Sequence, residues 1–313
     1  LCSTICRGFS DVALHLGKAS VSSHGEGEQL ARRLSQFPGF RVLRDLSFAG
    51  LVDEITSRSA DMRIVAIVDT ETTGLNPATD RLVEIAVERL SVDLAGRVIE
   101  MERPRSWRED PERPMPPRLA LLTGLTDADL SGCAFDDESI TALLGKADII
   151  IAHNAAFDRP FVDLRFPDLS HKAWGCSLSQ LDWLTFGFDG RALGHLLFQA
   201  GWFFKGHRAE QDVHALATLL SSTTEDDRTI LSHLLERCDR PTFRIAAVGA
   251  PFDAKEMLKL RGYRWDAALR HWWREIDGEA LADEKAWLDH AIYRLSGSQP
   301  TVSKMTATKR FSR

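Results

Sequence analysis

An apolar run over residues 64–68 leads directly into two carboxylates, Asp69 and Glu71, followed by a Thr/Gly turn over residues 72–75. The run is typical of a buried strand. If the strand continues through Glu71, its side chain and that of Asp69 point to the same side and can converge on one cation. Oxygen ligands of this kind favour Mg²⁺ or Mn²⁺ over zinc. The alternative is a solvated acidic strand end.

The chain has 313 residues, of which 44% are hydrophobic and 27% charged, as in a soluble globular protein of one large or two ordinary domains. No apolar run is long enough to span a bilayer, and the apolar patch over residues 12–16 is too short for a signal peptide. We therefore expect a cytoplasmic protein without a membrane partner. The five cysteines show no C-x-x-C spacing, which indicates neither a disulfide framework nor a zinc site.

The net charge of -6 is unevenly distributed along the chain. Residues 240–313 contain 14 Lys and Arg against 9 Asp and Glu, so the remainder is strongly acidic. A basic C-terminal part favours contact with a polyanion, although a solvated basic face is an equal alternative.

Residues 1–62 are expected to be an N-terminal extension, partly helical or disordered, with a helix over residues 29–37. From residue 63 strands and helices alternate. The expected strands are 64–69, 81–90, 96–101 and 148–152, and the expected helices are 136–144, 174–184 and 193–201. A proline-rich connection over residues 104–117 is expected to be extended.

Two later segments carry polar residues where a strand ends or a helix begins, the positions at which α/β folds place ligands. The strand over residues 148–152 is followed by His153, Asn154 and Asp158. Asn154 or Asp158 could simply cap a helix, and His153 could be a satisfied core residue. Further along, Asp212 falls in the first turns of a helix and His207 in the preceding loop, whereas His214 is expected to be an ordinary surface residue.

The order D-x-E, N-x-x-F-D, H-x-x-x-x-D resembles the three motifs of the DEDDh 3′-to-5′ exonuclease family, whose members include the proofreading epsilon subunit of bacterial replicative polymerases. The resemblance covers residues 63–222, which would form the exonuclease domain. It is supported by Thr-Thr-Gly-Leu at 72–75, Thr-Gly-Leu-Thr at 123–126 and His-Asn-Ala-Ala-Phe at 153–157. It implies an α/β fold with a ribonuclease H-like mixed sheet flanked by helices.

Hydrolysis of a phosphodiester requires neutralisation of charge on the phosphate and on the attacking and leaving oxygens, which two Mg²⁺ or Mn²⁺ ions accomplish. The resemblance implies that Asp69 bridges both ions, that Glu71 and Asp212 hold the first, and that Asp158 acts on the second. His207 would be the general base, because histidine changes charge near neutral pH.

The resemblance also implies a pocket for the 3′-terminal nucleotides. Its expected residues are Thr72, Leu75, Thr126, Asn154 and Phe157. The expected partner is nucleic acid with a free 3′ end, single-stranded or frayed, with DNA favoured over RNA, and the products are nucleoside 5′-monophosphates. A polymerase or repair partner is also expected, with a stand-alone role favoured because no polymerase-tethering tail is visible.

Two alternatives stay open. One is an exoribonuclease that trims RNA 3′ ends, because the motifs do not report the sugar. The other, from a different class, is a non-catalytic nucleic-acid-binding or interaction protein built on an exonuclease scaffold.

After a helical linker over residues 223–240, residues 241–296 are expected to form a small, basic, Trp-rich α+β domain. Its expected strands are 243–248 and 269–276, and its helices are 254–261 and 278–295. Arg261, Arg264, Arg270 and Trp272 would be accessory nucleic-acid contacts. The tryptophans could equally form the core of this domain. Residues 297–313 are expected to be a disordered tail.

Overall fold

The computed structural model describes residues 23–55, 59–294 and 297–312. The chain divides into two compact units, one of residues 1–237 with 311–313 and the other of residues 238–310. The expectations for residues 1–22, including Cys2, Cys6 and the patch at 12–16, lie outside the described residues. No helix in the described ranges has the length and apolar character needed to cross a membrane.

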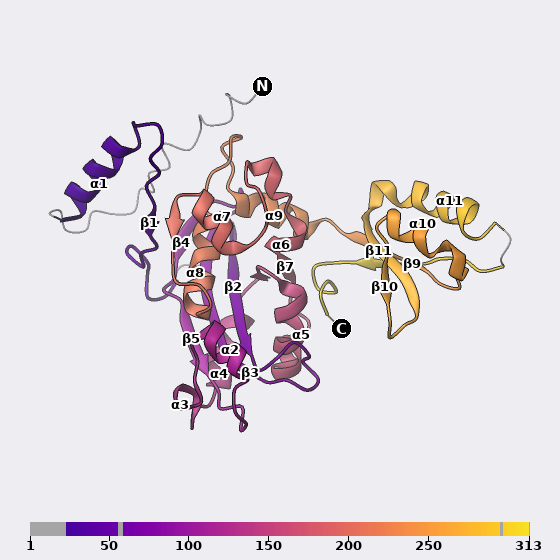
Figure 1. The fold of residues 1–313 in the computed structure, drawn as a ribbon, viewed down its shortest axis with the longest axis horizontal. Helices are drawn as coiled ribbons and strands as arrows, with labels where there is room; N and C mark the ends of the chain where they lie inside the picture. Colours follow the sequence, from indigo (N-terminus) through magenta and orange to yellow (C-terminus); the bar gives the residue numbers. More distant parts are fainter. Residues whose placement is uncertain (1–22, 56–58, 295–296, 313) are drawn as a thin grey trace. The chain divides into compact units, whose positions relative to one another are not determined.

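The first unit is built on a mixed sheet with the strand order β4-β3-β2-β6-β7 (Figure 1). β2 (Met62–Thr72), β3 (Leu82–Asp93) and β4 (Val98–Met101) are antiparallel, whereas β6 (Ile149–Ala152) and β7 (Trp174–Cys176) run parallel to β2. β5 (Arg105–Arg108) also pairs with β3, within the segment expected to be an extended connection. This arrangement confirms the ribonuclease H-like mixed sheet.

Helices cover both faces of this sheet. A core of Ala66 and Val68 from β2 with Ile140 from α4 (Asp137–Gly145) and Val162 from α5 (Ala155–Arg165) fills one side. α8 (Ala209–Leu220) packs against β2 and β3. Its side chains at Val213, Leu216 and Leu220 are fully buried, as the helical spacing predicts. The remaining elements of the unit are short: α2 (Pro117–Thr123), α3 (Asp127–Leu130), η1 (Pro167–Leu169), α6 (Ser177–Gln180), η2 (Trp183–Phe186), α7 (Leu193–Gln199) and β8 (Trp202–Phe203).

The helix expected over residues 174–184 is wrong in its first part, where β7 lies. Trp174 is fully buried beside Ile150, and the strand pairs with β6 over three residues. Three residues are too few to show a strand period, whereas sheet pairing decides their conformation.

Part of the N-terminal extension is folded onto the first unit. The helix begins earlier than expected, as α1 (Ser23–Leu34), and β1 (Arg44–Asp45) pairs in parallel with β8. The ring of Phe48 lies 4.7 Å from that of His214, whose Nε2 is 3.1 Å from the Ser47 carbonyl oxygen. His214 is therefore buried, not an ordinary surface residue, and its Nδ1 lies 2.9 Å from Glu88 Oε1.

The segment expected to be a helical linker is packed into the first unit through α9 (Ile230–Asp239). Ile230, Leu231 and Leu234 are buried on it, so the boundary between the units falls after Arg237 rather than after residue 240.

The second unit is an antiparallel sheet of order β10-β11-β9-β12 with two helices, α10 (Lys255–Leu260) and α11 (Leu281–Ala291). β9 (Thr242–Ala247) and β11 (His271–Asp277) agree with the two strands expected, whereas β10 (Arg264–Asp266) was not predicted. Two short turns, η3 (Phe252–Ala254) and η4 (Gly278–Ala280), precede the helices. The prediction of a disordered tail over residues 297–313 is wrong, because β12 (Thr301–Met305) pairs with β9 along its whole length.

Candidate active site

β2 carries the first two carboxylates because the strand does continue through Glu71. Asp69 pairs with Ala86 and Glu71 with Glu84 of β3, so both carboxylates lie on the same side of a continuous strand. Both side chains are half-buried at the end of the apolar run. The geometry required for convergence is therefore present.

Asp158 reaches the same place from α5. The side chain is 3% exposed, and Thr70 Oγ1 donates a 2.7 Å hydrogen bond to Asp158 Oδ1. Neither Asn154, at the N-cap of α5, nor Asp158 caps this helix through its side chain. His153, by contrast, is a satisfied residue whose ring nitrogens lie 2.9 Å from Ser177 Oγ and 2.7 Å from the Arg191 carbonyl oxygen.

The third segment brings Asp212 and His207 to the start of α8. Asp212 Oδ2 accepts a 3.0 Å hydrogen bond from the Arg208 backbone N–H. His207 is exposed in the preceding loop with φ of 65°, a left-handed conformation uncommon for a residue other than glycine. Such backbone strain is frequent at functional loops.

The carboxylates repel one another in a desolvated setting. Burial, then Asp158 and Asp212, raise the pKa of Asp69 well above its usual range. Burial followed by the charges of Asp212 and Glu84 raises the pKa of Glu71 to about 8. Burial raises the pKa of Asp158 to about 7 and that of Asp212 to about 6. The cluster thus lacks positive charge, which a divalent cation would supply.

Glu84 of β3 is a member of this neighbourhood that the sequence analysis missed. It is 1% exposed, and Arg108 Nε donates to its Oε1 at 2.8 Å while the Ala209 N–H donates to its Oε2 at 3.3 Å. Glu84 therefore ties β3 to the first residue of α8. The available signal was a charged residue between two apolar ones, Val83 and Ile85, within an expected strand.

The four carboxylates are the kind of oxygen ligand that Mg²⁺ and Mn²⁺ prefer, but they are not arranged as a complete metal site. Among the described residues, no three His, Cys, Asp or Glu side chains are grouped closely enough to hold a metal ion. Burial and the neighbouring carboxylates raise the pKa values of Asp69 and Glu71, and a bound cation would relieve this repulsion.

The residues expected to meet the substrate lie around these elements. Leu75 is 79% exposed, and Asn154 and Thr126 are exposed, whereas Thr72 is buried and donates to the Gly74 carbonyl oxygen at 2.6 Å. Phe157 is half-buried with its ring 5.2 Å from that of Phe161. Thr126 caps α3 in a capping box with Asp129. Their contacts with substrate stay a prediction.

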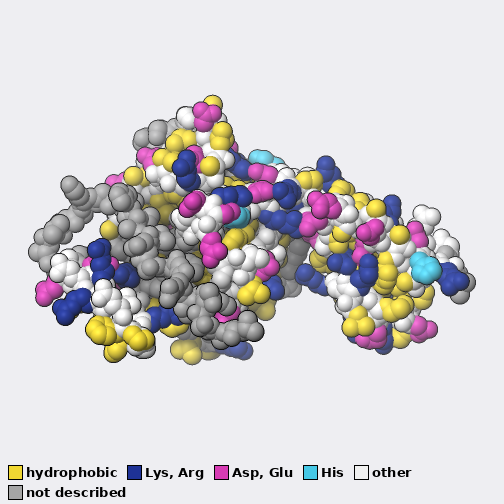
Figure 2. Space-filling model, turned by 90° about the horizontal axis from the view of Figure 1, so that it is seen from above, with side chains coloured by type: hydrophobic (Ala, Val, Ile, Leu, Met, Phe, Trp, Pro, Cys, Tyr) yellow, Lys and Arg dark blue, Asp and Glu magenta, His cyan; other side chains and the backbone are white. Residues whose placement is uncertain are grey.

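The expected accessory contacts of the second unit divide into two groups. Arg261 is paired with Glu284 at 3.1 Å and lies over Trp287, and Trp272 packs against the core beneath the helices. Arg264 and Arg270 are exposed. In Figure 2, Lys and Arg side chains are interspersed with Asp and Glu on the face shown, so charge alone identifies no binding surface there.

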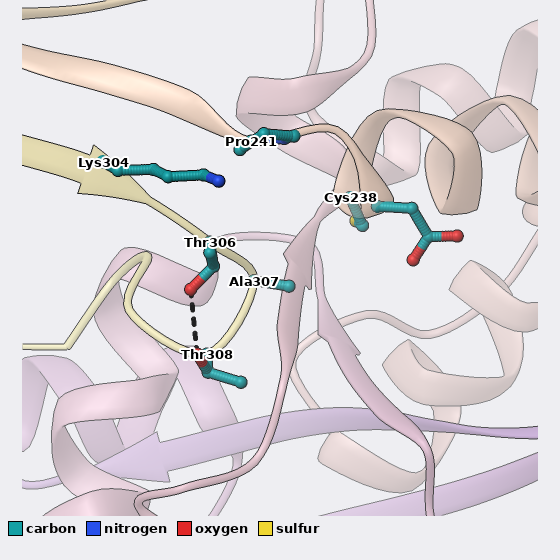
Figure 3. Close-up of a pocket in the computed structure, with 7 residues that line it drawn as sticks. Cys238, Pro241, Lys304, Thr306, Ala307 and Thr308 are labelled. Atoms are coloured by element: carbon teal, nitrogen blue, oxygen red, sulfur yellow. Dashed lines mark hydrogen bonds between the residues drawn. The ribbon is translucent and has the colours of Figure 1, made fainter.

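A hollow of about 320 Å³ in the second unit is lined by seven residues, including Cys238, Pro241, Lys304 and Thr306 (Figure 3). Lys304 extends along it, and the hydroxyls of Thr306 and Thr308 are 2.9 Å apart. None of the predicted catalytic residues lines it.

The first unit is thus an α/β protein with a ribonuclease H-like sheet, and the ends of its strands and helices carry desolvated carboxylates. Residues 66–220 match the model of the Exonuclease family.

Two of the similar proteins are DNA polymerase III proteins. The DNA polymerase III subunit epsilon of Treponema pallidum (strain Nichols) is 26% identical over 185 residues, which cover 56% of this chain and 83% of that subunit. A PolC-type DNA polymerase III of Thermotoga petrophila is 26% identical over 191 residues, or 56% of this chain. The chain spans only 12% of that polymerase.

Two solved structures are also similar. Exonuclease X in complex with 5′ overhanging duplex DNA has a TM-score of 0.39 and 25% identity, covering 54% of this chain and 99% of that one. E. coli exonuclease I in complex with a dA16 oligonucleotide has a TM-score of 0.43 and 16% identity, covering 79% of this chain and 64% of that one.

Proposed function

We propose that this protein is a divalent-metal-dependent 3′-to-5′ exonuclease that removes nucleoside 5′-monophosphates from DNA ends. The observation that carries the proposal is the set of carboxylates at Asp69, Glu71, Asp158 and Asp212. Burial raises the pKa of all four, and repulsion between them raises the pKa of Asp69 and Glu71 further. All four lie within the segment that matches the Exonuclease family. The DNA polymerase III names of the relatives favour DNA over RNA.

The four carboxylates would hold Mg²⁺ or Mn²⁺. Bound divalent ions supply charge neutralisation at the phosphate and a lowered pKa of bound water. Asp69 lies centrally, since Asp158, Asp212 and Glu71 all act on its pKa. The hydrogen bond from Thr70 orients Asp158, and the Arg208 N–H orients Asp212.

His207 would accept the proton of the attacking water. It is exposed, so a water and a phosphate can reach it, and it lies five residues before Asp212 at the start of α8. Its left-handed backbone sets the direction of the side chain. The 3′-terminal nucleotide would lie against Leu75, Thr72 and Thr126, with Asn154 and Phe157 beside the next one.

The test is release of mononucleotides from a 3′-labelled oligonucleotide with Mn²⁺. We expect Asp69→Ala and His207→Ala to abolish it, with Lys285→Gln in the second unit as a control. Undiminished release by Asp69→Ala would reject the assignment. Matched DNA and RNA strands separate the deoxyribonuclease from the exoribonuclease alternative, and binding without cleavage by the wild type would indicate the non-catalytic one. A pull-down for polymerase subunits tests the proofreading role.

A further inference from the structure

The sheet of the second unit has one face covered by helices and one that is not. Ile245 of β9 and Ile276 of β11 pack with Leu258 of α10 and Leu288 of α11 in one core. Since side chains alternate along a strand, neighbours of Ile245 and Ile276 at odd spacing point to the opposite face.

Arg244, Trp273 and Arg264 share that opposite face. Arg264 lies directly across from Trp273 in the pairing of β10 with β11, and Trp273 pairs with Ala246, two residues from Arg244. The Cζ atom of Arg244 lies 4.3 Å from the centroid of the Trp273 ring, and that of Arg264 lies 5.5 Å from it. One indole thus orients two guanidinium groups.

These two guanidinium groups lack anionic partners. Within the part of the chain that the structure describes, neither Arg244 nor Arg264 forms an ion pair, and Arg244 Nε is buried without a hydrogen-bond partner. Arg274, by contrast, is 3.3 Å from Glu284 on the helical side. A buried donor without an acceptor is rare in a folded protein and requires an explanation.

The acidic residue nearest in register does not supply the missing charge. Glu275 pairs with Arg244 across the strands, but it accepts hydrogen bonds from Thr242 Oγ1 and from Arg310 Nε, the latter at 3.3 Å. Arg310 is buried, and its guanidinium group also donates to Thr242 Oγ1 and to the Cys238 carbonyl oxygen. The positive charge of Arg244 is therefore not neutralised by Glu275.

Two hydroxyls extend the same face at the edge strand. Ser303 of β12 lies opposite Arg244, and Thr301 lies opposite Ala246. Both are exposed. Arg side chains bind phosphate oxygens in bidentate fashion, and hydroxyl groups also donate hydrogen bonds to phosphates. Two Arg side chains beside two hydroxyls therefore suit the successive phosphates of a nucleic-acid backbone.

We infer that Arg244, Trp273, Arg264, Ser303 and Thr301 form a site for the sugar-phosphate backbone of single-stranded DNA. The identity of the polyanion rests on the proposed exonuclease function. The site replaces Arg261 and Trp272, whose side chains are committed to Glu284 and to the core.

The experiment measures binding of fluorescein-labelled oligo(dT) to the full chain in EDTA, which prevents hydrolysis. We compare the wild type, Arg244→Gln/Arg264→Gln and the control Lys259→Gln/Lys285→Gln, which removes the same charge from α10 and α11. We expect the first double variant to bind roughly ten-fold more weakly, which corresponds to about 1.4 kcal/mol. Its slope of log K against log salt should fall by about 1.4, for two phosphates of a single strand.

Arg264→Gln alone, at an exposed position, keeps the test valid if the double variant fails to fold. Unchanged affinity and salt slope in the variants would overturn the inference, and persistent Mn²⁺-dependent nucleotide release would leave the proposed function intact. Weaker binding in the variant together with no release by the wild type would support the site and reject the function. Equal displacement of oligo(dT) by poly-glutamate would overturn the nucleic-acid assignment in favour of an acidic protein.

Discussion

Replacement of Glu71 with Gln should make the metal-free protein more stable at alkaline pH. The pKa of Glu71 is raised from 4.5 to about 8 by burial and by neighbouring carboxylates. The unfolded chain releases this proton near pH 4.5, whereas the folded protein keeps it until about pH 8, so folding stability falls as pH rises between those values. Glu71→Gln removes this contribution.

The magnitude follows from the same values. At 1.36 kcal/mol per pH unit, the full cost above pH 8 has an upper limit of about 5 kcal/mol. Glu71 is only half-buried, and solvent screening reduces the expected difference to about 2–3 kcal/mol. We therefore expect equal stability of variant and wild type at pH 4.5, and a variant that is more stable by that amount at pH 8.5.

The assay is urea-induced unfolding in EDTA at the two pH values, with amide hydrogen exchange of β2 and β3 peptides assigning the transition to the first unit. Addition of Mn²⁺ at pH 8.5 should stabilise the wild type more than the variant. Parallel stability curves for the two proteins across this pH range would refute the carboxylate cluster.

Three further predictions concern the supports of the site and of the fold. Glu84→Ala should lower kcat more than ten-fold with little change in KM, because the start of α8 loses its acceptor, and Glu84→Gln should recover most of the rate; equal loss in both would contradict positioning. Thr70→Val removes a hydrogen bond that lowers the pKa of Asp158, so the pH profile of nucleotide release should move to higher pH, whereas Thr70→Ser should leave it in place. His214→Ala leaves Glu88 buried without its partner and should cost about 3 kcal/mol in urea unfolding, and a loss below about 1 kcal/mol would count against the pair.

The candidate catalytic segments are visible in the sequence because each of them is local. A strand followed at once by Asp69 and Glu71, or a helix beginning before Asp212, is visible in the spacing of neighbouring residues. Glu84 was missed because its role depends on lying opposite Glu71 in the sheet and beside Ala209, 125 residues away. Strand register across such distances is not contained in local periodicity.

The same reason explains the errors in the fold. The Ser/Thr/Lys-rich segment after residue 297 has few apolar residues, yet β12 is held by pairing with β9. His214 looked like a surface residue because the covering segment at Ser47 and Phe48 lies far away in sequence. Tertiary partners decided both cases, while the apolar runs of β2 and β3 and the helical spacing of α8 sufficed for the main sheet.

The buried carboxylates in the described part of the first unit fall into two groups, those that accept hydrogen bonds from a side chain of the protein and those that do not. Glu84 accepts from Arg108, Glu88 lies 2.9 Å from His214, and Glu102 pairs with Arg89. These three are matched by donors from the protein, so each contributes to the fold.

Asp69 and Glu71 differ, since in the described ranges no side chain donates a hydrogen bond to either, while acidic neighbours raise the pKa of both. Leaving a desolvated charge unmatched destabilises a fold by several kcal/mol. Carboxylates that serve only the structure would gain by pairing as Glu84 and Glu102 do. The absence of such partners at Asp69 and Glu71, in the same sheet that provides them elsewhere, is the physical reason for proposing that divalent cations bind there.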